Sequence, residues 1–185
     1  MNPNLYVSLL HEGMNDKTGK VVTTSVTLID VHDLARSSRT FGAERFFVSH
    51  PSPTMRTLVR SLQSHWGDGF GARYNPDRKD ALELLDVVAN LDEAIHKIDT
   101  VHGRLPKLIA TSAINGPDRV PFAEMRDKIF ESDEPYMLLI GTGWGMGDAL
   151  LERADYFLEP IAGFGDYNHL SVRSATAILL SRLMG

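Results

Sequence analysis

The 185-residue sequence contains no cysteine. This absence excludes disulfide bonds, thiolate metal sites and a cysteine nucleophile. The seven histidines show no H-E-x-x-H or other close ligand spacing, so we expect no bound metal. A chain without cysteine also fits a reducing compartment, and we expect a cytoplasmic protein.

Long apolar runs and a basic leader are missing as well. No stretch approaches the roughly 20 apolar residues that span a bilayer. The first residues, MNPNLYVSLLHEG, have no basic segment and too short an apolar run for a signal peptide, so we expect no membrane association. A formal net charge of −5 argues against a non-specific nucleic-acid coat but leaves room for a local basic patch.

The hydrophobic content of 43% is enough for a proper core, and neither repeats nor linker-like segments divide the chain. We therefore expect a single domain over residues 1–185. Short apolar strands alternate with amphipathic helices almost from end to end. This alternation predicts an α/β fold with a mostly parallel sheet and helices on both faces. The expected strands are Leu5–Leu10, Arg45–Ser49, Asp86–Ala89, Leu108–Thr111, Tyr136–Gly141 and Tyr156–Pro160.

Helix boundaries are marked by residues that favour helix starts. Asn75 before Pro76 predicts a helix that runs through Leu85, and Asn90 with Glu93 predicts a capped helix directly after it. Further helices are expected near 55–66, after Pro121, and from about 170 to 183.

Three loops rich in glycine and small polar residues follow the last three strands. They are SAINGP after Thr111, GTGWGMG after Ile140, and EPIAGFGDYNHLS after Leu158. In open α/β folds, ligands bind beyond the carboxyl ends of the strands. Ordinary strand-to-helix turns explain any one of these loops, but they explain all three together less well.

The glycine loop does not match the common phosphate-binding motifs. A P-loop needs a lysine and then Ser or Thr after its last glycine, but Met146, Gly147 and Asp148 follow Gly145. A G-x-G-x-x-G fingerprint starting at Gly141 fails because its sixth position is Met146. Such a fingerprint also normally opens the first βαβ unit, so a dinucleotide-binding oxidoreductase is a poor fit.

A second group of polar residues lies on a predicted helix near the N-terminus. His32, Arg36 and Arg39 share one helix face at i, i+4 and i+7. Two arginines so placed can hold phosphate through paired hydrogen bonds. The residues alone favour the simpler interpretation, a solvated face on which Asp33 pairs with Arg36.

Taken together, these segments resemble the SPOUT superfamily of S-adenosylmethionine-dependent RNA methyltransferases, the α/β-knot proteins. GKVVTTSVTLIDVHDLARSSRTFGAERFFVS is similar to the first strand–helix–strand of that superfamily, LLIGTGWGMGDALLERADYFLEPI to its glycine loop, and DYNHLSVRSATAILLSRL to its C-terminal motif. The likeness is greatest to a bacterial subfamily of stand-alone domains that are also found attached to a tRNA guanine-N1 methyltransferase.

The resemblance implies a trefoil knot in the C-terminal third, a homodimer, an RNA substrate, and S-adenosylmethionine held in a bent form by the three loops. A cofactor without phosphate would explain why no lysine follows the glycines. Carried over by position, the cofactor contacts are Thr111, Ser112, Ala113, Gly141, Thr142, Gly143, Leu158, Pro160, Ile161, Asn168, Leu170 and Ser171.

The resemblance also implies that Arg36 or Arg39 holds RNA phosphate or assists the nucleophile. Asp166 is the preferred general base, with His169 and Glu159 as alternatives, and Asp166→Asn is expected to lower turnover while cofactor affinity stays nearly intact. Relatives that methylate ribose often have a glutamate at the position of Gly143, which argues against ribose 2′-O methylation, and the target atom stays open. Trp144 has no assigned role.

Two other functions stay open at this point. The domain can be an accessory module that binds S-adenosylmethionine and RNA without transferring a methyl group. It can also be a dinucleotide-binding oxidoreductase of ordinary doubly wound fold.

Overall fold

The computed structural model describes residues 3–67, 73–165 and 167–185. Its main element is a seven-stranded sheet in which every strand pair is parallel. The strand order is β5-β4-β1-β8-β6-β9-β7. The strands are β1 (Leu5–Leu10), β4 (Arg45–Ser49), β5 (Leu85–Val88), β6 (Lys107–Ala110), β7 (Arg119–Val120), β8 (Tyr136–Ile140) and β9 (Tyr156–Leu158).

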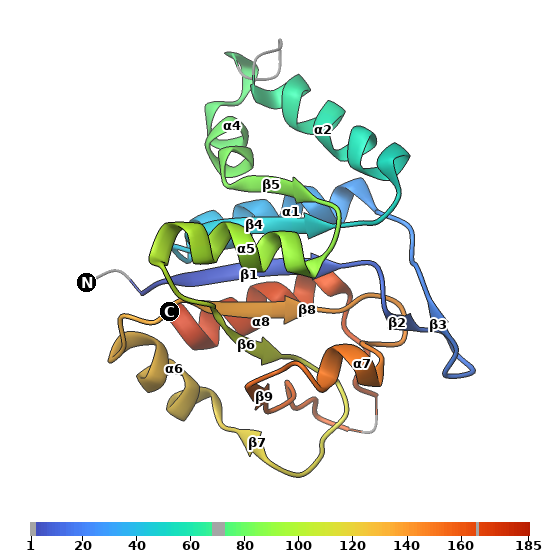
Figure 1. Cartoon of the computed structure of the whole chain (residues 1–185), viewed down its shortest axis with the longest axis vertical. Coiled ribbons are helices and arrows are strands. Elements are labelled where there is room, and N and C mark those ends of the chain that lie inside the picture. Colours follow the sequence, from blue (N-terminus) through green and yellow to red (C-terminus); the bar gives the residue numbers. More distant parts are fainter. Residues whose placement is uncertain (1–2, 68–72, 166) are drawn as a thin grey trace.

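Helices cover both faces of this sheet (Figure 1). One face packs against α1 (Leu28–Thr40), α2 (Pro53–Gly67), α4 (Pro76–Glu83), α6 (Phe122–Phe130) and α8 (Val172–Met184). The other face packs against α5 (Leu91–His102) and α7 (Asp148–Leu151). The predicted α/β class with a parallel sheet is confirmed, whereas the knot stays a prediction.

The strand order explains how the loops come together. In a doubly wound dinucleotide fold, successive strands continue outward after the switch point. Here β8 instead returns to the centre and pairs with β1 on one side and β6 on the other. The glycine loop after β8 is therefore flanked by the carboxyl ends of β1 and β6, and the order argues against the oxidoreductase alternative.

Local sequence signals set several boundaries. The side chains of Asn75 and Asn90 accept hydrogen bonds from the N–H groups of Arg78 (3.1 Å) and Glu93 (2.9 Å), so both predicted N-caps are confirmed. Four of the predicted strands end earlier than expected: β5 stops before Ala89, β6 before Thr111, β8 before Gly141, and β9 before Glu159. The last helix begins at Val172 rather than near Leu170, because Ser171 is its N-cap.

The sequence prediction missed a short antiparallel hairpin between β1 and α1. It pairs β2 (Met14–Asn15) with β3 (Val21–Val22). Figure 1 shows it projecting beyond the carboxyl ends of β1 and β8. Within the described part of the chain, no helix is both long and apolar enough to cross a membrane.

Candidate active site

The three predicted loops lie at the carboxyl edge of β6, β8 and β9, and two of them are directly bonded. The Asn168 side-chain amide donates to the carbonyl oxygen of Ala113 at 3.0 Å. Thr111 donates from its hydroxyl to the Leu139 carbonyl at 2.8 Å, which ties the first loop to the end of β8. The structure thus brings the first and third loops together, as the sequence predicted.

Residues of the third loop differ in exposure and in what they bond. Leu158 is fully buried, Pro160 and Ile161 are half-buried, and Leu170 is exposed. The Ser171 hydroxyl oxygen accepts the N–H of Ser174, so it serves as the cap of α8. Asp166, the preferred base from the sequence, lies outside the described residues.

The two alternative bases differ in their surroundings. The Glu159 carboxylate accepts the N–H of Phe122 at 2.6 Å, at the first residue of α6. This contact gives Glu159 a structural role at a helix N-terminus. His169 is exposed, and its ring lies edge-on to Tyr167 at 5.3 Å between centroids. Of the two, only His169 has a side chain that makes no hydrogen bond to another described residue.

The glycine loop, residues 141–147, is held by the segment that leads into the hairpin. Asn15 donates its N–H to the Gly145 carbonyl (2.8 Å) and accepts the N–H of Trp144 (3.1 Å). Gly147 donates to the Gly13 carbonyl at 2.8 Å, and Met14 pairs with Met146 as an isolated bridge. This part of the loop therefore makes an antiparallel contact with residues 13–15.

Gly143 shows why glycine is needed in this loop. Its φ of +61° lies in the left-handed region, and a Cβ there would stand 3.2 Å from both the Asn15 carbonyl oxygen and the Thr24 methyl group. The close approach is thus to residues of the same chain. The sequence prediction attributed the glycines to ligand approach and had no means of seeing Asn15 opposite them.

Thr24 joins the ends of β1 and β8 through a hydrogen-bonded chain. Its hydroxyl lies 2.5 Å from the Thr142 hydroxyl and 3.0 Å from Nδ1 of His11. Thr142 in turn donates to the Leu10 carbonyl at 3.0 Å. Thr142, predicted as a cofactor contact, therefore has its side chain engaged inside the protein.

Two buried histidines stand behind Thr24. His11 follows β1 and His50 follows β4, and their rings are 5.4 Å apart between centroids. Nδ1 of His50 accepts the N–H of Ser52, so its Nε2 carries the proton that is donated to the Thr24 carbonyl at 3.0 Å. Burial, with the neighbouring His50, lowers the pKa of His11 to about 4. His11 is thus neutral near pH 7.

The sequence reasoning missed this histidine pair, although a signal for it was available. It applied the rule that ligand-site residues follow parallel strands only to the last three strands. Applied to the first two strands as well, the same rule singles out His11 after Leu10 and His50 after Ser49.

The two candidate arginines of α1 lie in different surroundings. Arg39 forms an ion pair with Asp80 of α4, with Nε 2.8 Å from Oδ2. Arg36 is exposed and makes no ion pair with any residue that the structure describes. Asp33 contacts Arg173 of α8 at 3.6 Å, so the Asp33–Arg36 pair expected for a solvated face is wrong.

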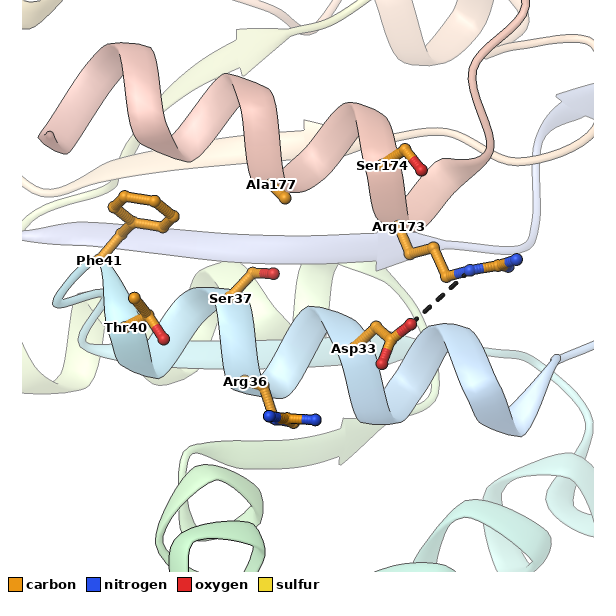
Figure 2. Close-up of a pocket in the computed structure, with 8 residues that line it drawn as sticks. All are labelled: Asp33, Arg36, Ser37, Thr40, Phe41, Arg173, Ser174 and Ala177. Carbon is orange, nitrogen blue, oxygen red and sulfur yellow. Dashed lines mark ion pairs between the residues drawn. The ribbon is translucent and has the colours of Figure 1, made fainter.

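Arg36 is among the residues that line a groove of about 420 Å³ between α1 and α8, and its guanidinium extends from α1 on the side away from α8 (Figure 2). Its other lining residues are Asp33, Ser37, Thr40, Phe41, Arg173, Ser174 and Ala177. The Arg173 guanidinium is also held by Asp30 at 3.0 Å. Because Arg173 follows Ser171 by two residues, this groove begins next to the third loop. Arg36 is therefore the available cation on this side of the site.

No group of three or more His, Asp or Glu side chains is placed to hold a metal ion among residues 3–67, 73–165 and 167–185. The three loops offer mainly hydroxyls, amides and carbonyls, together with the Glu159 carboxylate and the His169 ring, and the Arg119 guanidinium donates to the Ile114 carbonyl at 3.1 Å. None of the segments 112–117, 141–147 and 159–171 contains a lysine or arginine. Such a donor set suits a ligand without phosphate.

Known proteins decide which ligand class this is. A sequence profile of a family described as SAM-dependent RNA methyltransferases matches residues 4–185. The chain belongs to this family. Its cofactor is thus S-adenosylmethionine and its substrate class is RNA.

Individual proteins are also similar to this chain. The chain is 37% identical over 183 residues to an uncharacterized protein of Aquifex aeolicus, covering 99% of this chain and 89% of that protein. It is 41% identical over 182 residues to a tRNA (guanine-N(1)-)-methyltransferase of Oleidesulfovibrio alaskensis, covering 98% of this chain but only 42% of that enzyme. The SpoU methyltransferase AviRb of Streptomyces viridochromogenes, solved with AdoMet, shares the fold, with a TM-score of 0.59 at 16% identity over 100% of this chain and 58% of that one.

Proposed function

We propose that this methyltransferase domain binds S-adenosylmethionine between the three loops 111–118, 141–147 and 159–171 and methylates an RNA nucleotide presented next to Arg36. The main support is geometric. The first and third loops are joined by the Asn168–Ala113 hydrogen bond, and the α1–α8 groove with its unpaired arginine begins beside the third loop.

The donor set of the loops fits this cofactor. S-adenosylmethionine supplies an activated methyl group on a sulfonium and carries no phosphate, so the absence of lysine and arginine from the loops is in keeping with it. Residues that would hold it are Thr111, Ser112, Ala113, Gly141, Gly143, Leu158, Pro160, Ile161, Asn168 and Leu170. The half-buried Pro160 and Ile161 offer apolar surface, and the loop backbones offer hydrogen-bond partners.

The chain's own contribution to the reaction is orientation and charge. Bound S-adenosylmethionine would supply the methyl group to the RNA nucleophile and leave as S-adenosylhomocysteine, and a base would take the acceptor's proton. Arg36 would neutralise a phosphate beside the target nucleotide and so fix the acceptor in line. Among the candidate bases that the structure describes, the exposed His169 is the one proposed to take the proton.

The family assignment does not identify which RNA is methylated. The chain spans 42% of the length of the tRNA methyltransferase it matches, so that enzyme's guanine chemistry is not assigned to this domain. We propose tRNA as the first RNA class to test, because the two are similar over 98% of this chain.

The decisive experiment distinguishes an enzyme from a non-catalytic binding module. Purified protein is incubated with methyl-labelled S-adenosylmethionine and RNA from cells that lack the protein. We expect label in one RNA class, and none in RNA from cells that contain the protein. Calorimetric binding of S-adenosylmethionine with no label in any RNA would support the accessory module instead.

We further propose a homodimer. Apolar side chains of the loops stand in solvent in the single chain, including Ile114 (74% exposed), Phe164 (110%) and Tyr167 (78%). Exposed apolar side chains gathered at one edge are typical of an interface. Burial of this edge against a second copy would also cover the cofactor.

Light scattering tests the dimer. We expect a mass of twice the 20.5 kDa chain. Phe164→Ser with Tyr167→Ser should shift the protein toward monomer, whereas Val101→Ser, at another exposed apolar position on α5, should leave the dimer intact. A wild-type protein that stays monomeric at tens of micromolar would contradict the proposal.

A further inference from the structure

The β2–β3 hairpin stands at the same edge of the sheet as the cofactor loops (Figure 1). The proposed roles of the loops and of the α1–α8 groove assign no function to this hairpin. Residues 17–21 at and after its turn, KTGKV, are all exposed. Lys17 and Lys20 make no ion pair with any residue in the described ranges. The hairpin thus presents two free cations close to the site.

The hairpin is built to hold these lysines in place. Oδ1 of Asp16 accepts hydrogen bonds from the N–H of Thr18 (2.7 Å), the hydroxyl of Thr18 (2.6 Å) and the N–H of Lys20 (3.1 Å). These contacts lower the pKa of Asp16 and keep its carboxylate turned into the turn. The turn therefore carries the Asp16 carboxylate and two lysines, and its net charge is positive.

The base of the hairpin and the glycine loop form one unit. Asn15 makes the backbone bonds to Trp144 and Gly145 described above, and its side chain donates to the Met146 carbonyl at 3.4 Å. Met14 is fully buried, and its sulfur accepts the N–H of Thr142 at 3.2 Å. A ligand that pulls on the hairpin therefore acts on the loop that borders the cofactor.

Trp144 extends this unit with an aromatic surface. Its backbone is bonded to Asn15, yet its side chain is 66% exposed. An aromatic side chain left in solvent at the base of a hairpin that carries exposed lysines offers the two kinds of group with which proteins bind single-stranded RNA. The ring stacks on a base, and the cations hold the flanking phosphates.

We propose that the hairpin and Trp144 together form an RNA-binding arm. Trp144 stacks on an unpaired base near the target nucleotide, and Lys17 and Lys20 hold phosphates on one side of it. The proposal rests on RNA being the substrate class. It also gives a function to the glycine-loop tryptophan, whose role the sequence did not assign.

Binding experiments test the arm separately from methyl transfer. The probe is unmodified tRNA prepared by transcription, measured by fluorescence anisotropy at several salt concentrations. Lys17→Ala with Lys20→Ala should weaken binding about tenfold and flatten the slope of log K against log salt by about 1.4–1.8, since two phosphate contacts are lost. Affinity for S-adenosylmethionine should change less than twofold.

The matched control removes two lysines at the opposite edge of the sheet. Lys107 begins β6 and Lys128 lies in the last turn of α6, and each is in an ion pair, with Asp155 and Glu124 respectively. Lys107→Ala with Lys128→Ala makes the same change in net charge. We expect it to leave the salt slope unchanged, because neither lysine is near the arm.

Trp144 is tested by substitution and by its own fluorescence. Trp144→Ala should weaken RNA binding at least fivefold, and Trp144→Phe should restore most of the affinity. In Trp66→Phe, Trp144 is the remaining tryptophan, and RNA should quench its emission. An unchanged salt slope in the double lysine variant, or a normal affinity for RNA in the Trp144→Ala variant, would overturn the arm. If the wild-type protein binds RNA but transfers no label to it, only the proposed function is overturned.

Discussion

Replacement of Arg36 by alanine is expected to lower the rate of methyl transfer at least about a hundredfold, because it removes the one unpaired cation described in the groove beside the third loop. An arginine that aligns the substrate acts in the transition state more than in cofactor binding. The affinity for S-adenosylmethionine should therefore change less than twofold. Single-turnover transfer of labelled methyl groups and calorimetry measure the two quantities.

Arg39 provides the matched control. It lies on the same helix, but its guanidinium is 2.8 Å from the Asp80 carboxylate, in an exposed pair that contributes little to stability. We expect Arg39→Ala to change the rate less than threefold, and Arg36→Lys to recover only part of the activity, because lysine lacks the planar fork of arginine. Equal losses in the Arg36 and Arg39 alanine variants would show that neither has a specific role.

The separation of Arg36 from Arg39 illustrates what a sequence can and cannot predict. The 3.6-residue period correctly placed both on one helix. Their difference depends on Asp80, which is 41 positions further along the chain and reaches Arg39 only because α4 packs against α1. Periodicity contains no information about such a partner.

Local chemistry predicted the elements whose causes are local. Asn90 caps α5, and Glu93 bonds back to the N–H of Ala89 at 2.7 Å, four positions away. The hairpin was missed because its two strands have only two residues each and owe their stability to the glycine loop, more than 120 positions away. The need for glycine at position 143 was missed for the same reason, because Asn15 and Thr24, which approach it, are far away in the sequence. The family resemblance predicted which three loops form the cofactor site, but it did not predict that Asn15 and Thr24 hold the glycine loop in place.

The network of Thr24 has a consequence for stability against pH. Nδ1 of His11 is 3.0 Å from the Thr24 hydroxyl, and its Nε2 is buried with no hydrogen-bond partner among the described residues. Protonation would place a charge on this orphaned nitrogen, beside the buried His50. The folded state therefore holds His11 neutral, in accordance with its lowered pKa.

Wild-type protein is expected to lose stability as the pH falls through the window between 6.5, the ordinary pKa of histidine, and the folded-state pKa of about 4. In this window the unfolded chain binds a proton at residue 11 and the folded chain does not, so acid favours unfolding. A shift of this size corresponds to roughly 2.5 kcal/mol by pH 4.5, relative to neutral pH. Urea unfolding at pH 7.5 and pH 4.5 measures the loss.

His11→Asn isolates this contribution, because asparagine keeps an N–H for Thr24 but does not titrate. The variant should be less stable than wild type at pH 7.5, where the smaller side chain leaves a gap. Its loss of stability on acidification should nevertheless be smaller than that of wild type by roughly 2.5 kcal/mol, since all other titrating groups are shared. Equal losses in both proteins would mean that His11 becomes protonated without unfolding, and that the hydrogen-bonded chain to Thr142 and the glycine loop tolerates its charge.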